Sequence, residues 1–130
     1  MGRVILVRHG QASLGSDDYD QLSPRGIEQG ERLGEHWKRE GMRFGAVWRG
    51  TLRRHCQTLD AITSRMPGLP PPREHAGLNE YDAHALLRAT YPGPFAPPQD
   101  AEQVKAHFRA LREALRCWAD GSVAPHGMPS

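Results

Sequence analysis

The 130-residue sequence predicts an α/β fold in which a mostly parallel sheet is flanked by helices. Residues 4–7, Val-Ile-Leu-Val, form an apolar run rich in β-branched side chains, which is typical of a central parallel strand buried on both faces. A second apolar stretch at residues 46–48 comes directly before a helical pattern. Strands that alternate with amphipathic helices indicate this fold class.

The first strand is expected over about residues 3–8, and the first helix follows a polar loop. Ser23 is a favourable N-cap and Pro24 a favourable first helical residue, and this helix is expected to end at Gly41. Apolar or small residues recur on one of its faces, which predicts that this face lies in the core. They are Ile27, Gly30, Leu33 and Trp37.

A second strand near residues 46–48 is expected to lead into a helix over about 52–65. After proline-rich connections, Asp100 and Gln103 resemble a capping box that opens a long helix. The apolar residues of this last helix repeat at four-three-four-three spacing and predict an amphipathic stripe. They are Val104, Phe108, Leu111, Leu115 and Trp118.

Arg8, His9 and Gly10 directly follow the first predicted strand. Ligands of open α/β sheets bind beyond the carboxyl ends of the strands, which is where this triplet is expected. A guanidinium grips two phosphate oxygens, an imidazole attacks phosphorus, and a glycine lets the backbone turn and a ligand come close. By itself the triplet is equally compatible with a solvated strand end. Two later segments, residues 50–58 and 77–82, favour the functional interpretation.

With those segments, the sequence resembles the histidine phosphatase superfamily, the phosphoglycerate mutase-like proteins, over residues 4 to about 82. The Arg-His-Gly motif of that family is matched by residues 8–10, and its first-helix motif by residues 22–29. The family's second arginine, with a Gln-Thr pair three residues on, falls on Arg54, and its proton-donor glutamate falls on Glu80.

The resemblance implies a phosphomonoester hydrolase that forms a phosphohistidine on His9. It implies that Glu80 is the proton donor and that further residues bind the phosphate, namely Arg8, Arg54, Gly10 and Gln11. Arg53 is the alternative to Arg54 as the inward arginine, and Asp82 is the alternative to Glu80. The expected substrate is a small phosphorylated molecule, with neither a cofactor nor a metal.

The sequence also departs from the family pattern. Ala12 and Gly15 stand where many members have polar residues, so the substrate class is not implied. The family's second catalytic histidine is not found, because His126 and Gly127 follow a turn-rich linker and are interpreted as loop residues. The chain is therefore expected to be incomplete at the C-terminus and weak or inactive by itself. The alternative is an inactive or regulatory phosphate-binding relative.

The domain organisation expected is a single histidine phosphatase-like domain over residues 1–130. Residues of about 83–120 are expected to form a helical insertion that covers the site as a lid, as the resemblance implies. The sequence gives no indication of the oligomeric state.

Composition favours an intracellular domain without nucleic-acid partners. The 17 Lys and Arg residues exceed the 15 Asp and Glu residues by only two, which is too little for a nucleic-acid binder on charge alone. Neither a signal peptide nor a membrane-spanning segment is recognised, so a cytoplasmic location is expected. Cys56 and Cys117 fit no metal-ligand spacing, and the helical pattern favours Cys56 as a packing residue.

Overall fold

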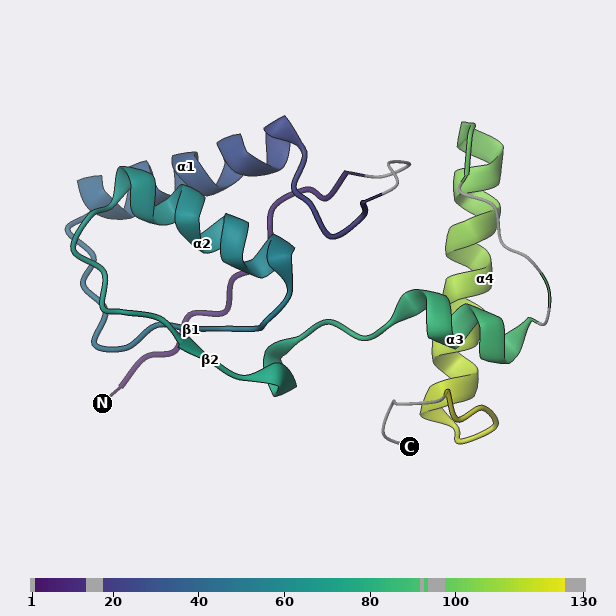
Figure 1. The fold of residues 1–130 in the computed structure, drawn as a ribbon. Helices are drawn as coiled ribbons and strands as arrows, with labels where there is room; N and C mark the ends of the chain where they lie inside the picture. Colours follow the sequence, from purple (N-terminus) through teal and green to yellow (C-terminus); the bar gives the residue numbers. More distant parts are fainter. Residues whose placement is uncertain (1, 14–17, 92, 94–97, 126–130) are drawn as a thin grey trace. The chain divides into compact units, whose positions relative to one another are not determined.

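The computed structural model describes residues 2–13, 18–91, 93 and 98–125, drawn in colour in Figure 1. The chain divides into two compact units, residues 1–79 and residues 80–130, and each is described by itself. His126, Gly127 and Gly15 lie outside the described residues, so the interpretation of His126–Gly127 as a loop stays a prediction.

The described residues of the first unit form two helices, a small parallel sheet and a short 3-10 helix. In chain order these are α1 (Pro24–Arg39), β1 (Trp48–Arg49), α2 (Arg53–Arg65), β2 (Arg73–Glu74) and η1 (Ala76–Leu78). In the sheet Trp48 pairs with Arg73 and Arg49 with Glu74, in parallel. Helices over a parallel sheet confirm the predicted fold class, and the predicted second strand and second helix are found within two residues of their expected positions.

The N-terminus of α1 has the predicted cap. The Ser23 hydroxyl accepts a hydrogen bond from the backbone N–H of Gly26 at 3.1 Å, and Pro24 occupies the first helical position. The helix ends at Arg39, and Gly41 then turns the chain with a φ of 65°. That left-handed conformation costs a glycine little, so the predicted stop at Gly41 has a direct structural cause.

The predicted core face of α1 is wrong in part. The buried residues of this helix are Gly26, Gly30 and Gly34, whereas Ile27 is 41% exposed. A Cβ atom on Gly30 would lie 2.7 Å from the Cβ of Ala61 in α2. The two helices therefore pack with their backbones close together. Gly30 is buried as predicted and Leu33 and Trp37 are half-buried, so the prediction is wrong at Ile27 and omits Gly26 and Gly34.

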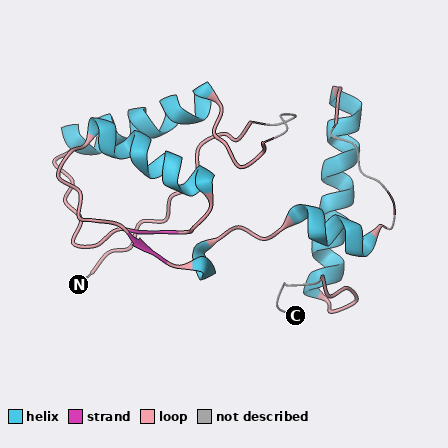
Figure 2. Cartoon of the chain, viewed as in Figure 1, coloured by secondary structure: helices cyan, strands magenta, loops and turns pink. Residues whose placement is uncertain are grey.

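The predicted strand over residues 3–8 is not found, and Figure 2 shows this segment as a loop. Val4 is 84% exposed and Leu6 89% exposed. A strand requires a hydrogen-bonded neighbour, but in the described part of the chain β1 pairs with β2. The apolar segment instead runs along an open cavity of about 1050 Å³ that it shares with β1 and α2.

Where the structure describes it, the second unit consists of two helices, α3 (Ala83–Thr90) and α4 (Ala101–Ala119). Asp100 caps α4 as predicted by accepting from the N–H of Gln103 at 2.8 Å. The Gln103 side chain accepts from the N–H of Gln99, one residue before the cap, so the capping box is shifted.

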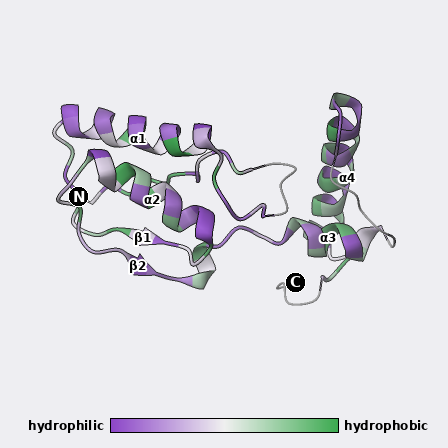
Figure 3. Cartoon of the chain, turned by 45° about the horizontal axis from the view of Figure 1, so that its top comes forward, coloured by the Kyte–Doolittle hydropathy of each residue, from purple (hydrophilic) through white to green (hydrophobic). Residues whose placement is uncertain are grey.

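The core of this unit contains Leu86 and Leu87 of α3 and Ala114 of α4. The predicted stripe on α4 is confirmed in its C-terminal half, where Leu111, Leu115 and Trp118 pack against this core. Val104 and Phe108 of the stripe are exposed, and Figure 3 shows hydrophobic and hydrophilic residues interleaved along the helix. The lid role of residues 83–120 stays a prediction. Among the described residues, no helix combines the length and apolar character needed to cross a membrane.

Candidate active site

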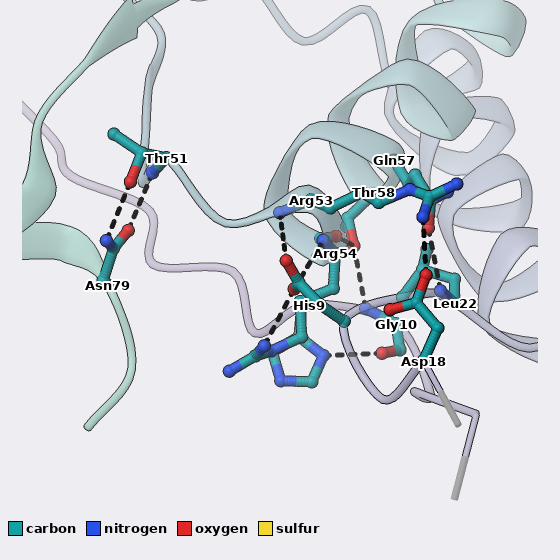
Figure 4. A network of polar contacts seen from close by, with 11 residues as sticks. His9, Gly10, Asp18, Leu22, Thr51, Arg53, Arg54, Gln57, Thr58 and Asn79 are labelled. Carbon is teal, nitrogen blue, oxygen red and sulfur yellow. Dashed lines mark hydrogen bonds and ion pairs between the residues drawn. The ribbon is translucent and has the colours of Figure 1, made fainter. Parts of the chain in front are cut away.

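The segment that carries His9 is tied to the first turns of α2. The backbone N–H of Gly10 donates to the Thr58 hydroxyl at 3.0 Å, and this hydroxyl donates in turn to the carbonyl oxygen of Arg54 at 2.7 Å. Both Gly10 and Thr58 are buried, so water competes little for these bonds. His9 and Arg54, 45 residues apart in sequence, therefore belong to one hydrogen-bonded network (Figure 4).

The same segment lies directly against the first turn of α1. A Cβ atom on Gly10 would lie 2.9 Å from the carbonyl carbon of Gly26, and one on Gly26 would lie 2.8 Å from the backbone nitrogen of Gln11. Real Cβ atoms do not come this close to backbone atoms. From the sequence, a glycine is expected at position 10 because a ligand comes close to the backbone there. The structure shows a second reason, because the α1 backbone also lies close to Gly10.

His9 has a fixed orientation. Its Nδ1 lies 2.6 Å from the carbonyl oxygen of Gly10. A carbonyl oxygen only accepts hydrogen bonds, so Nδ1 carries the proton, and in the neutral ring Nε2 holds the lone pair. The half-buried ring lines the cavity together with His55, and the two ring centroids are 5.9 Å apart.

Arg53 and Arg54 open α2 together but lie in different surroundings. Arg54 is only 8% exposed, its Nη1 lies 2.9 Å from Oδ1 of Asp20, and its guanidinium stacks 5.5 Å from the centre of the Tyr19 ring. Arg53 is exposed and pairs with Asp18 at 2.6 Å. Adjacent helical residues face about 100° apart, which explains why only one of the two points inward.

Asp20 caps the N-terminus of α2. Leu52 occupies the N-cap position and makes no side-chain capping bond, and the Asp20 carboxylate accepts instead from the N–H groups of Arg53 at 2.9 Å and Arg54 at 3.2 Å. Burial alone raises the pKa of this carboxyl, but the bonds from the two amides and from the Arg54 guanidinium outweigh burial. The pKa of Asp20 therefore lies below its ordinary value of 3.8.

We expect Asp20 to stabilise the fold at neutral pH and to lose this contribution in acid. Because its pKa is lower in the folded than in the unfolded chain, the unfolded chain binds the proton first as the pH falls. The contribution is therefore complete above pH 3.8 and disappears as the pH falls through the lower folded pKa. Urea unfolding of the unmodified chain and of Asp20→Asn from pH 7 down to about pH 2 measures it.

In that measurement the free energy of unfolding of Asp20→Asn should fall less steeply in acid than that of the unmodified chain. Asp18→Asn, which removes the same charge from the exposed pair with Arg53, is the control. Equal acid dependence of the unmodified chain and Asp20→Asn contradicts the prediction.

Gln57 and Thr58, the Gln-Thr pair after Arg54, connect α2 to two other segments by hydrogen bonds. Thr58 binds Gly10, as described above, and the Gln57 side chain accepts from the N–H of Leu22 at 2.8 Å, just before α1. In the sequence, the spacing of this pair serves only to identify Arg54. Its structural role is to join α2 to both the His9 segment and the start of α1.

Asn79 fixes the loop before α2 by two hydrogen bonds to Thr51. The Asn79 amide accepts from the N–H of Thr51 at 2.7 Å and donates to the Thr51 hydroxyl at 2.9 Å. Gly50 is buried here, and a Cβ atom on it would lie 2.9 Å from Cε1 of His55. A glycine at this position therefore gives the His55 ring its space beside the cavity.

A comparison with known protein families shows the family of this chain. The family model described as the histidine phosphatase superfamily (branch 1) matches residues 4–116, which is most of the chain. The chain belongs to the histidine phosphatase superfamily. The match includes the His9 segment, α1, α2 and most of α4.

Curated relatives of this histidine phosphatase chain are 2,3-bisphosphoglycerate-dependent phosphoglycerate mutases. The protein from Porphyromonas gingivalis is 34% identical over 73 residues, which cover 51% of this chain and 29% of the relative. The protein from Treponema denticola is 35% identical over 71 residues, covering 49% and 28%. The protein from Xanthobacter autotrophicus is 30% identical over 158 aligned residues, covering 95% and 75%. The chain thus spans less than a third of the first two relatives.

Three of the predicted site residues of this superfamily member belong to one network. His9, Gly10 and Arg54 share the network described above. Arg8 is exposed, and the N–H of Gln11 donates to the side chain of Gln29 in α1 at 2.9 Å.

The predicted proton donor lies in the other unit. Glu80 is exposed and is the first residue of the second unit, so its role as proton donor stays a prediction. Its alternative, Asp82, caps α3 by accepting from the N–H of Ala85 at 2.9 Å.

Cys56 and Asp20 differ in how far the sequence indicates their roles. Cys56, interpreted as a packing residue, is half-buried, and its Sγ lies 2.8 Å from Nη1 of Arg49. Asp20 was missed by sequence reasoning, because a carboxylate in a polar loop carries no signal for the helix that it caps 33 residues later.

Proposed function

We propose that this chain is a phosphomonoester hydrolase that forms a phosphohistidine on His9. The observation that carries the proposal is the contact of His9 Nδ1 with the Gly10 carbonyl, because it places the proton on Nδ1 and leaves the lone pair of the neutral ring on Nε2, the nitrogen that would act as the nucleophile. The Gly10–Thr58–Arg54 network supports the proposal by tying the backbone next to His9 to the backbone of Arg54, a residue that is itself buried.

In the proposed reaction Nε2 of His9 attacks the phosphorus of a small phosphate monoester. A P–N bond forms as the P–O bond to the leaving alcohol breaks, and the leaving oxygen takes the proton of the Glu80 carboxylic acid. Arg54 and Arg8 neutralise the phosphoryl oxygens as their charge grows in the transition state. Water then breaks the P–N bond, releases inorganic phosphate and returns the proton to Glu80.

The choice between hydrolysis and transfer depends on the acceptor of the phosphoryl group. The relatives are named as mutases. We propose hydrolysis, with water as the acceptor. We also propose a reducing, cytoplasmic setting, which the free thiols of Cys56 and Cys117 support.

Mapping of the phosphorylated residue tests this function. The chain is incubated with a phosphate-labelled aryl phosphate, quenched in alkali because phosphohistidine is labile in acid, and digested for peptide mapping. We expect label on His9, and neither label nor turnover in His9→Ala. His36→Ala, which removes an exposed imidazole from α1, is the matched control and should keep both.

The outcomes of this experiment are distinct. Label on Cys56 or His55, or intact turnover in His9→Ala, contradicts the proposal. Tight binding of vanadate, a phosphate analogue, without label or turnover supports the alternative function instead. That alternative is an inactive or regulatory phosphate-binding relative.

A further inference from the structure

We propose that Asp20 is a positioning residue of the phosphoryl site, which holds the Arg54 guanidinium and the first turn of α2 ready for the phosphate. The inference rests on the proposed function, because it assigns a role in the same site. It adds a residue from the loop before α1 to a site predicted from the His9 segment and α2.

One carboxylate holds Arg54 at both of its ends. Asp20 Oδ1 accepts from the backbone N–H of Arg54 at 3.2 Å and from Nη1 of the same residue at 2.9 Å, while Oδ2 accepts from the N–H of Arg53 at 2.9 Å. A long side chain fixed at its backbone and at its tip has already lost most of its rotamer freedom. A ligand that binds the guanidinium then has less ordering to do.

Burial makes this carboxylate necessary. Arg54 is 8% exposed, and a guanidinium removed from water requires a nearby opposite charge. The Tyr19 ring stacks on the guanidinium from the same loop. The loop therefore supplies both a counter-charge and a packing surface to Arg54.

The effect of Asp20 extends to His9. The first turn of α2 that Asp20 caps presents the Arg54 carbonyl to Thr58, and Thr58 binds the N–H of Gly10 beside His9. A change in the first turn of α2 thus reaches both the proposed nucleophile and the proposed phosphate-binding arginine.

The negative charge of Asp20 also repels an anionic ligand, so the two effects must be compared. The Asp20 side chain is 38% exposed, and water and salt screen its charge. A guanidinium has five N–H donors, so a bond through Nη1 leaves the group capable of binding a phosphate. We therefore expect positioning to outweigh repulsion.

The adjacent pair provides a matched control. Asp18 and Arg53 have the same residue types, lie two and one positions away, and form an ion pair at 2.6 Å with both side chains about half exposed. An exposed pair of this kind contributes little to structure. Asp18→Asn therefore makes the same charge change without removing the cap or the partner of Arg54.

The experiment compares the unmodified chain with Asp20→Asn, Asp20→Glu and Asp18→Asn. Vanadate affinity and kcat/KM for an aryl phosphate are measured at a temperature at which all four proteins are folded. We expect Asp20→Asn to lose about tenfold or more in both quantities, Asp20→Glu to recover part of the loss, and Asp18→Asn to stay within about twofold. Solvent exchange of the Arg54 side-chain N–H groups, followed by NMR, reports positioning directly and should accelerate only in the Asp20 variants.

A purely capping role for Asp20 would lower the melting temperature and leave the vanadate affinity of the folded protein unchanged. Equal vanadate affinity in Asp20→Asn and Asp18→Asn overturns the inference, and so does unchanged exchange at Arg54. If exchange accelerates in Asp20→Asn but the unmodified chain neither binds vanadate nor turns over the aryl phosphate, the proposed function is what fails.

Discussion

Replacement of Arg54 with alanine is expected to reduce turnover of an aryl phosphate by about 10²–10³-fold, the usual cost of removing a donor that stabilises transition-state charge. Vanadate affinity should fall at least about tenfold, since charge-assisted hydrogen bonds contribute about 1.5–3 kcal/mol. Arg53→Ala should change either quantity by less than about threefold. The difference follows from burial, because Arg54 is enclosed by Tyr19 and Asp20 whereas Arg53 is exposed.

Steady-state kinetics and vanadate titration of the two variants measure this difference. Arg54→Lys is a useful third variant, because it keeps the charge and loses the two-pronged geometry, so an intermediate loss is expected. Circular dichroism confirms that each variant is folded before its activity is compared. Similar losses in Arg53→Ala and Arg54→Ala would show that the assignment of the inward arginine is wrong.

The starts of α1 and α4 were predictable because their signals are local. Ser23 and Pro24 mark the start of α1, and Asp100 marks the start of α4, by bonds to residues within three or four positions. The strand over residues 3–8 was not predictable in the same way. An apolar run indicates a tendency to be buried, but strand formation depends on a partner that is distant in sequence.

The site shows the same division between local and distant signals. His9 was predicted from its place after an apolar run, and Arg54 from its offset to the Gln-Thr pair. The cap of α2 was not predictable, since Asp20 reaches it from 33 residues away. The face of α1 was predicted only in part, with Gly30 but without Gly26 and Gly34, because apolar periodicity assumes contact through side chains and these glycines make their contacts through the backbone.

Gly26→Ala is the second substitution with a large expected effect. By helix propensity alone the change should stabilise α1 by about 0.5–1 kcal/mol, because alanine is favoured over glycine inside a helix. The new Cβ atom, however, would lie 2.8 Å from the backbone nitrogen of Gln11 and closer still to its carbonyl oxygen. Backbone atoms cannot rotate away as a side-chain tip can, so α1 or the His9 segment must move.

We expect steric cost to exceed propensity, so that Gly26→Ala lowers the free energy of unfolding by about 2–3 kcal/mol. Because Gln11 and Gly10 directly follow His9, phosphorylation of His9 should fall as well. Gly45→Ala is the matched control, since its Cβ atom would meet nothing within 4 Å, and it should change stability by less than about 0.5 kcal/mol. Urea unfolding and phosphate labelling of both variants measure the effects. Greater stability in Gly26→Ala would mean that propensity prevails and that the close approach of α1 to the His9 segment does not constrain the site.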